Sequence, residues 1–383
     1  MTERYFAPCP RGLEAALSDE LQRIGASDLA ATDGGVAFAG DLRLALIANL
    51  ESRLASRILW RVGSGPYRDE RDVYAIVHAI AWQRLFNAER TIRVDIAATR
   101  SPLTSLEFAT LKVKDAICDR FRAERGARPS VDKRAADVRV NLYLTDRDAT
   151  VYVDTSGDPL FKRGYRREGV EAPLRENLAA GLLALAGWTP QQPLLDPMCG
   201  GGTIVVEAAL IAANRAPGIK RSFGFQKLGW YDGPAWQRLK QAARDRVRQP
   251  PDRTTIFGSD IDALAVARAL SHLDAADVRR FAVVERADVL ARGAPADSGV
   301  LLTNPPYGVR LDDQRKLAEF YPRVGDALKK HFAGWTAYVF SADLRLPKLL
   351  GLKVTARTPL YNGALECRLF RIPLFAGSLR EAR

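Results

Sequence analysis

The order of apolar and polar positions divides the chain into two parts with different patterns. In the first part, short segments such as 138–144 (VRVNLYL) and 149–154 (ATVYVD) alternate apolar and polar residues, which is typical of half-buried strands. From about residue 173 onward, short apolar runs alternate with longer segments of helical spacing. Strands that alternate with helices form parallel sheets with helical crossovers, so the second part predicts a mostly parallel α/β sheet.

The first part is predicted as two small α/β units followed by a connector. Residues 1–42 combine two short strands with a helix whose leucines repeat on one face, and residues 43–156 continue with alternating strands and helices. The predicted strands are 5–7, 36–38, 58–62, 91–97, 138–144 and 149–154, and the predicted helices are 12–24, 42–50, 72–80 and 108–121. Residues 157–172 form a polar connector marked by Gly and Pro.

The second part, residues 173–383, is predicted as one α/β unit with a terminal hairpin. Its expected strands are 193–199, 255–260, 281–289 with its end at Asp288, 299–302 and 336–341, and its expected helices are 173–186, 203–214, 261–273 and 315–332. Residues 217–253 are interpreted as an insertion. Residues 353–374 read as two strands around Tyr361-Asn362-Gly363-Ala364, which contains Asn-Gly, a dipeptide favoured in two-residue hairpin turns.

Polar residues and glycines gather where four of these strands end, which is where open α/β sheets bind ligands. The first strand opens into DPMCGGGT (196–203), whose glycines let the backbone approach a ligand and whose following helix start favours a carboxylate. Asp260 ends the next strand and suits the hydroxyls of a ribose, and Asp288 is placed to accept from an adenine amino group. The fourth strand ends in TNPPYG (303–308).

TNPPYG has the chemistry to hold an exocyclic amino group. The Asn304 amide oxygen and the Pro305 carbonyl both accept hydrogen bonds, and Pro306 restricts the backbone between them and the next turn. Tyr307 offers a ring on which a flat base can stack. A plain strand-ending turn is the structural alternative, because Asn-Pro commonly starts turns.

The sequence of the glycine loop indicates which class of nucleotide cofactor the site would bind. Residues 200–202 do not fit GxGxxG, and no GxxxxGK[ST] motif occurs, so neither a nicotinamide site nor a phosphate-cradling loop is indicated. A methionine-type zwitterion at the start of the helix, with an adenosine along the strand ends, fits these motifs better.

The composition also predicts a polyanionic binding partner. The net charge is +12 and the pI is about 9.7, which favours nucleic acid. Residues 120–139 carry a local excess of arginine and lysine on a helix end and the following loop, where phosphates are within reach, although a solvated helix face is the alternative. In the connector, basic residues around Tyr165 either contact RNA or dock the two parts together, and we favour docking.

Other classes of site are not indicated. The four cysteines are widely spaced, which suits a reducing cytosol, and the three histidines have no metal-ligand spacing, so we expect neither disulfides nor a metal. The N-terminus carries charges where a signal peptide needs an apolar core, and no apolar run approaches the length of a membrane span. We therefore expect a cytoplasmic, monomeric protein.

The four motifs together resemble the class I S-adenosylmethionine-dependent methyltransferases that methylate amino groups. Residues 43–156 resemble a THUMP RNA-binding domain, and residues 1–42 its ferredoxin-like N-terminal part. LFKRGYR in the connector, the long DPMCGGGT run and LYNGALECRL (360–369) are similar to the N-terminal half of the bacterial 23S rRNA guanine-N2 methyltransferase family. Gly201 stands where that family often has Ser, and we expect little effect. The fused family members carry a second methyltransferase, whose activity we expect to be absent here.

This resemblance implies a Rossmann-like, seven-stranded methyltransferase sheet, S-adenosyl-L-methionine as cofactor and 23S rRNA as substrate. The implied catalytic residues are Asn304, Pro305, Pro306 and Tyr307. The implied cofactor-binding residues are Asp196, Pro197, Cys199, Gly200, Gly202, Thr203, Asp260, Ile261, Asp288, Val289 and Asn304. The predicted RNA contacts are Arg120, Arg125, Arg128, Lys133, Arg134, Lys162, Arg163 and Arg166.

Several alternatives stay open at this point. The same chemistry on tRNA is the nearest one, and DNA adenine or glutamine methylation also uses an NPPY-like motif. An RNA-binding assembly factor with a vestigial cofactor site is the non-enzymatic alternative. Glu207, in the apolar helix, is interpreted as a structural partner rather than a base.

Overall fold

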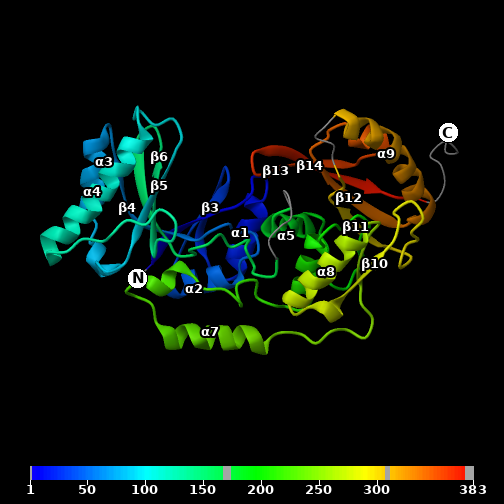
Figure 1. The fold of residues 1–383 in the computed structure, drawn as a ribbon, viewed down its shortest axis with the longest axis horizontal. Coiled ribbons are helices and arrows are strands. Elements are labelled where there is room, and N and C mark those ends of the chain that lie inside the picture. Colours follow the sequence, from blue (N-terminus) through cyan, green and yellow to red (C-terminus); the bar gives the residue numbers. More distant parts are fainter. Residues whose placement is uncertain (1, 167–173, 307–310, 376–383) are drawn as a thin grey trace.

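The computed structural model describes residues 2–166, 174–306 and 311–375, and these form two seven-stranded sheets (Figure 1). The N-terminal sheet has the strand order β2-β3-β1-β4-β7-β6-β5, and the C-terminal sheet has the order β10-β9-β8-β11-β12-β14-β13. Within these ranges, no helix is both long enough and apolar enough to cross a bilayer.

The N-terminal sheet is continuous across the two predicted N-terminal units. Tyr5 and Phe6 of β1 pair antiparallel with Trp60 and Leu59 of β4, which joins the first unit to the second. The first unit consists of β1 (Glu3–Pro8), α1 (Glu14–Arg23), β2 (Ser27–Thr32), β3 (Gly35–Gly40) and α2 (Leu42–Glu51). Strand β2 escaped prediction because it is an exposed edge strand without an alternating apolar pattern.

The second unit places two helices against its part of this sheet. It consists of β4 (Leu59–Pro66), α3 (Glu70–His78), β5 (Ile92–Ala98), α4 (Leu106–Arg125), β6 (Val138–Leu144) and β7 (Asp148–Asp154), with a short 3-10 turn at Trp82–Arg84. Helix α4 begins at Ser105, whose hydroxyl accepts from the Phe108 amide (3.1 Å), and ends at Gly126 in the left-handed conformation. Its last turn carries Arg125, one of the residues predicted to contact RNA.

The C-terminal sheet has the predicted methyltransferase-like topology. Strands β10, β9, β8, β11 and β12 run parallel, and β14 returns antiparallel to β12. Leu194 and Leu195 of β8 are both fully buried but belong to different core clusters, so both faces of the sheet are covered. The strands are β8 (Leu194–Asp196), β9 (Ile256–Asp260), β10 (Ala282–Arg286), β11 (Gly299–Thr303), β12 (Trp335–Ser341), β13 (Ala356–Asn362) and β14 (Leu365–Pro373). The helices are α5 (Glu176–Leu185), α6 (Thr203–Ala212), α7 (Gly233–Asp245), α8 (Ala263–Ala275), α9 (Leu311–His331) and α10 (Leu346–Leu350).

The predicted insertion 217–253 connects the two halves. It contains α7 and the 3-10 turn Gly224–Lys227, and in Figure 1 α7 lies along one side of the molecule, near α2. The Phe225 amide donates to the Thr155 carbonyl (2.8 Å), and the Gly229 amide donates to the Leu85 carbonyl (2.7 Å). The insertion therefore fastens the C-terminal half, which contains the second sheet, to the second N-terminal unit.

The connector docks the two halves, as we favoured. Tyr165 is buried and donates to Glu207 Oε1 (3.1 Å) in α6, and Arg163 Nε lies 3.5 Å from the same oxygen. Glu207 is fully buried and contacts both of these connector residues, which supports the interpretation of Glu207 as a structural partner. The RNA contact predicted for Arg163 is wrong, because only 4% of this residue is exposed and its guanidinium also donates to two backbone carbonyls.

Two local predictions differ from the structure. Strand β10 ends at Arg286, two residues before Asp288, and its last bond to β9 runs from the Ala287 amide to the Asp260 carbonyl (3.1 Å). The turn between β13 and β14 consists of Gly363 and Ala364, since Asn362 still pairs with Leu365. Gly363 has a positive φ (65°) at the first turn position, where glycine is favoured.

Candidate active site

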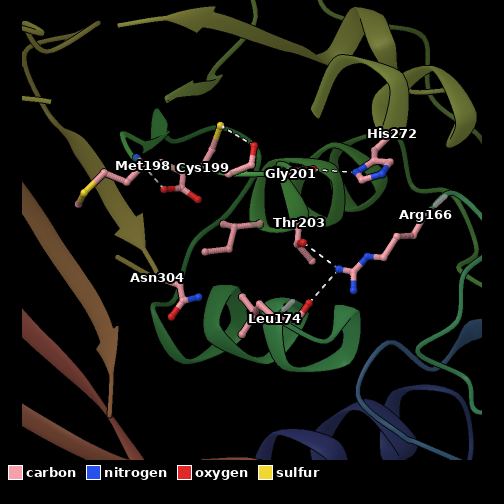
Figure 2. A pocket seen from close by; sticks show the side chains of 11 residues that line it. Arg166, Leu174, Met198, Cys199, Gly201, Thr203, His272 and Asn304 are labelled. Carbon is pink, nitrogen blue, oxygen red and sulfur yellow. Dashed lines mark hydrogen bonds between the residues drawn. The ribbon is translucent and has the colours of Figure 1, made fainter. Parts of the chain in front are cut away.

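Two cavities lie at the carboxyl ends of the parallel strands and share Met198, Gly200 and Asn304. The smaller has a volume of about 190 Å³ and is framed by Asn304 on one side and by Arg166 and His272 on the other (Figure 2). The larger, of about 470 Å³, extends along the ends of β9 and β10. Its volume lies within the range of about 300–1,000 Å³ that is typical of ligand sites.

The glycine loop after β8 has two glycines that its geometry requires. Gly200 and Gly202 have positive φ angles of 52° and 76°. A Cβ on Gly202 would also lie 2.7 Å from the Cβ of Ala269 in α8, so Gly202 allows α6 and α8 to approach. Gly202 does not line either cavity, and its predicted role is therefore that of shaping the loop.

Gly201 tolerates a side chain, as the resemblance suggested. A Cβ there would meet only the His272 ring, at an ordinary contact distance of 3.5 Å. The Gly201 carbonyl accepts from Nδ1 of His272 (2.8 Å), which ties the loop to α8.

Asp260 is oriented by backbone amides at the edge of the larger cavity. Its two carboxylate oxygens accept from the amides of Gly200 (2.9 Å) and Asp262 (3.0 Å). Asp262 itself caps α8 by accepting from the Leu264 amide (2.9 Å). The carboxylate ending β9 is thus fixed where a pair of ribose hydroxyls can donate to it.

Asp196 is the most perturbed carboxyl group of the site. It ends β8, is 2% exposed and lines the smaller cavity. Burial raises its pKa to about 7, against the hydrogen bonds from the Thr303 side chain and from the Met198 amide (3.3 Å), and the nearby charge of Asp260 adds to the rise. A carboxylate with this pKa in a cavity is suited to a cationic ligand group.

The far end of the larger cavity combines one carboxylate with apolar side chains. Asp288 orients its loop by accepting from the Leu290 amide (2.9 Å), and Val289 beside it is buried. Ile261 is 61% exposed although it lines the cavity, so it presents an apolar surface that a flat ligand would cover. Phe320 of α9 adds an aromatic side chain that sequence patterns did not single out.

Asn304 stands at the point shared by the two cavities. Its Oδ1 is buried and has no hydrogen-bond partner among the described residues. Pro306 lines the larger cavity, and its carbonyl accepts a hydrogen bond from the hydroxyl of the buried Tyr321. Pro305 lines a small apolar pocket below them. Tyr307 and Gly308 lie outside the described residues.

Arg166 lies in the smaller cavity, and sequence reasoning had placed it elsewhere. It was predicted to contact RNA, but its Nη2 donates to Thr203 Oγ1 (2.9 Å) and to the Leu174 carbonyl (2.9 Å), and its Nε lies 3.5 Å from Glu176 (Figure 2). This position near the start of α6 is suited to a carboxylate ligand. The sequence offers only one signal that Arg163 and Arg166 have different environments, which is that they lie three residues apart in the connector.

The other predicted RNA contacts line neither cavity and lie on the second N-terminal unit and the connector. Arg120 is half-buried and paired with Glu124 (2.5 Å), so it contributes little free charge. The remaining residues are exposed: Arg125, Arg128, Lys133, Arg134 and Lys162. Among the described residues, no group of histidine, cysteine and acidic side chains is arranged to hold a metal ion.

Three family models match consecutive parts of the chain. The RMKL-like methyltransferase domain matches residues 163–371, the RlmL ferredoxin-like domain matches residues 4–59, and the THUMP domain matches residues 67–154.

Curated relatives and solved structures resemble nearly the whole chain. The ribosomal RNA large subunit methyltransferase K/L of Syntrophotalea carbinolica is 42% identical over 97% of this chain and 53% of its own length. The protein of the same name from Methylococcus capsulatus is 41% identical over 97% of this chain and 51% of its own length. The chain thus spans about half the length of these relatives.

Among solved structures, SMU.472, named as a methyltransferase and crystallised with SAH, superposes with a TM-score of 0.88. It is 28% identical and the match covers 99% of each chain. A protein described as an N6-adenine-specific DNA methylase from Listeria monocytogenes gives a TM-score of 0.88 at 29% identity, covering 98% of this chain and 97% of its own.

Proposed function

Because the chain belongs to the RMKL-like methyltransferase-domain family, we propose that it methylates N2 of a guanine in 23S rRNA, with S-adenosyl-L-methionine as the methyl donor. One observation supports an amino group as the methyl acceptor. The buried Oδ1 of Asn304 lacks a hydrogen-bond donor among the described residues. A buried acceptor without a partner is costly, so this atom awaits a donor from a ligand.

The larger cavity fits the adenosine part of the cofactor. Asp260, held by two backbone amides, accepts from the ribose hydroxyls. Asp288 accepts from the adenine amino group, and Ile261 and Val289 enclose the ring. The exposed apolar surface of Ile261 supports this assignment, because a bound purine would remove it from water.

The smaller cavity fits the amino acid part of the cofactor. Asp196 and Arg166 line it with opposite charges, which matches an ammonium and a carboxylate on one carbon. Thr203 at the start of α6 is held by Arg166 and adds the helix N-terminus to the carboxylate side. The bound cofactor supplies an activated methyl group on its sulfonium, and these residues set its direction.

The residues after β11 position the acceptor. Asn304 Oδ1 and the Pro305 carbonyl accept from the two hydrogens of an exocyclic amine, which directs the lone pair of the nitrogen towards the methyl group. Tyr321 holds the Pro306 carbonyl and so restrains this segment. Alignment of this kind supplies about 7–11 kcal/mol of the barrier, and the proton is lost after transfer, so no separate strong base is required.

The RNA substrate is supported by charge and by the N-terminal units. The exposed Arg125, Arg128 and Arg134 lie at and beyond the end of α4 in the region that matches the THUMP domain. Together with a net charge of +12, they give this unit a surface that attracts phosphates.

The test is methyl transfer from labelled S-adenosyl-L-methionine to protein-free 23S rRNA from cells that lack this protein, followed by nucleoside mass analysis. We expect N2-methylguanosine, and we expect Asn304→Ala to reduce its rate by roughly 100-fold or more while the variant still binds RNA. Label in adenosine, or label in tRNA or protein offered in parallel reactions in place of the rRNA, would redirect the proposal to another substrate. A near wild-type rate for Asn304→Ala would remove Asn304 from catalysis.

A further inference from the structure

A third cavity lies where the N-terminal sheet meets the catalytic half. We call it the hairpin cleft. It has a volume of about 140 Å³ and lies between the loop after β1, the start of α5 and the turn between β13 and β14. The polar residues that line it are Arg11, Ser56, Arg175, Tyr361 and Asn362. LYNGALECRL, which the methyltransferase site does not use, thus supplies one wall of the cleft.

The walls of the hairpin cleft are packed against each other, so the cleft is a fixed feature. A Cβ on Gly12 would lie only 2.3 Å from the carbonyl oxygen of Pro359 in β13, which shows how closely the two halves approach. Leu360 of β13 is fully buried in the core that both halves share. Asn177 of α5 also donates to the Ser56 hydroxyl (3.1 Å) across the same junction.

The hairpin cleft and the methyl-transfer cavities lie at the same edge of the catalytic sheet. Strand β14 pairs Arg368 with Ser341, the last residue of β12, and continues to Leu365, three residues further. At about 3.3 Å per residue, the hairpin projects roughly 10 Å past the strand ends, on the side of Asn304. Leu174 lines the smaller cavity, and its neighbour Arg175 lines the hairpin cleft.

Two guanidinium groups in the cleft lie over aromatic rings. Arg11 lies 4.8 Å from the ring centre of Tyr361, and Arg175 lies 5.1 Å from that of Phe161. A guanidinium stacked by its face keeps its N–H groups free to donate in its own plane, the arrangement that binds a phosphate with two hydrogen bonds. Arg11 also pairs with Asp33 (2.8 Å), but both side chains are more than half exposed, so this pair is weak.

The chemistry of the cleft favours a phosphate over other ligands. None of the described residues that line it is acidic, and Arg175 forms no ion pair within the described ranges. Its volume is below the range of about 300–1,000 Å³ typical of whole small-molecule ligands, which suits a phosphate with part of a sugar. Ser56 and Asn362 add polar groups for the oxygens of such a ligand.

We propose that the hairpin cleft binds a backbone phosphate of the RNA, from a nucleotide near the one that is methylated. The proposal rests on the proposed function and extends it with a second contact at the same edge of the sheet. By holding the strand beside the target, the cleft restricts which base can reach Asn304. The N-terminal basic surface and the hairpin cleft then act on different segments of the same RNA.

The test is the double variant Arg11→Gln/Arg175→Gln in the full chain, with Arg4→Gln as the matched control. Arg4 is an exposed arginine of the same sheet, 4.0 Å from Asp28, and it lies outside every cavity described above. We expect the double variant to bind protein-free 23S rRNA about tenfold more weakly, with a salt slope smaller by about 0.7–1.4, as for one or two single-strand phosphates. The double variant should keep the wild-type affinity for SAH, and Arg4→Gln should keep the wild-type affinity for rRNA and the wild-type salt slope.

A second measurement needs no variant. In the wild-type chain, phenylglyoxal modification of Arg11 and Arg175, mapped by mass spectrometry, should be slowed by 23S rRNA and not by SAH. Equal RNA affinity and salt slope in the double variant and Arg4→Gln, or no protection of the two arginines by RNA, would refute the cleft while the proposed function stands. Protection by inorganic phosphate but not by RNA would make it a free-anion site and overturn the proposal. A wild-type chain that neither binds nor methylates RNA would overturn both.

Discussion

Replacing Asp196 with Asn tests whether the perturbed carboxylate binds the cofactor ammonium. Burial raises the pKa of Asp196 from 3.8 to about 7. At 1.36 kcal/mol per pKa unit, this shift destabilises the folded chain by about 4 kcal/mol above pH 7, where the group is ionised in both states. At pH 5, where the folded chain keeps the proton and the unfolded chain has mostly lost it, the destabilisation is about 2 kcal/mol. Between these pKa values the folded chain holds a proton that the unfolded chain has lost, so stability falls as the pH rises.

The same titration controls the cofactor, because only the ionised carboxylate attracts an ammonium. We therefore expect the Kd of the wild-type chain for SAH to rise up to tenfold for each pH unit below 7 and to level off above it. Isothermal titration between pH 5.5 and 8.5 measures this dependence. The Asp196→Asn variant should bind SAH more weakly at pH 8 and should lack the wild-type rise at low pH, and any titration of the ligand itself appears equally in both proteins.

Urea unfolding of the unliganded proteins gives an independent reading of the same charge. The gain in stability of Asp196→Asn over wild type should be larger at pH 8 than at pH 5, by about 2–3 kcal/mol. The reasoning is refuted if the wild-type Kd is flat across this range, if both proteins show the same rise, or if the stability difference does not change with pH.

Three further predictions concern the loop, the junction and the RNA surface. Gly202→Ala should weaken SAH binding more than tenfold, because its φ of 76° and the contact with α8 both oppose a Cβ, whereas Gly201→Ala should stay within about threefold in the same titration. Glu207→Gln should lower the free energy of unfolding by about 3–5 kcal/mol, since it leaves the Arg163 guanidinium buried without a counter-ion; an unchanged urea midpoint would contradict this. Replacing Arg125, Arg128 and Arg134 with Ala should reduce the salt slope of rRNA binding by about 2, and an unchanged slope would remove this surface from the interface.

The sequence allowed the architecture and the order of the strand-end motifs to be predicted because both depend on local patterns. Apolar runs followed by Asp196, Asp260 and Asn304 mark the carboxyl ends of parallel strands, which converge wherever such a sheet forms. The structure places these three residues around two adjoining cavities. Their chemical roles, and the division of the chain at residues 42, 156 and 172, stay predictions.

Features that depend on tertiary contacts escaped prediction. Among the described strands, β2 pairs only with β3, at an exposed edge of the sheet, and its side chains carry no periodic signal. The Gly363-Ala364 turn depends on the register that pairs Asn362 with Leu365, which places the glycine at the first turn position. The contact of Tyr321 with Pro306 joins a helix to a strand end and has no sequence pattern.

The connector shows how one basic segment serves two environments. Arg163 and Arg166 lie three residues apart, and each reaches an acidic residue of the catalytic half, Glu207 and Glu176 respectively. Arg163 also donates to the carbonyl of Arg53 (2.6 Å), between α2 and β4, whereas Arg166 donates to Thr203 at the smaller cavity. A displacement of the N-terminal sheet relative to α6 would therefore act on the segment that carries Arg166. The contacts that join the two halves thus also hold a residue of the cofactor cavity in place.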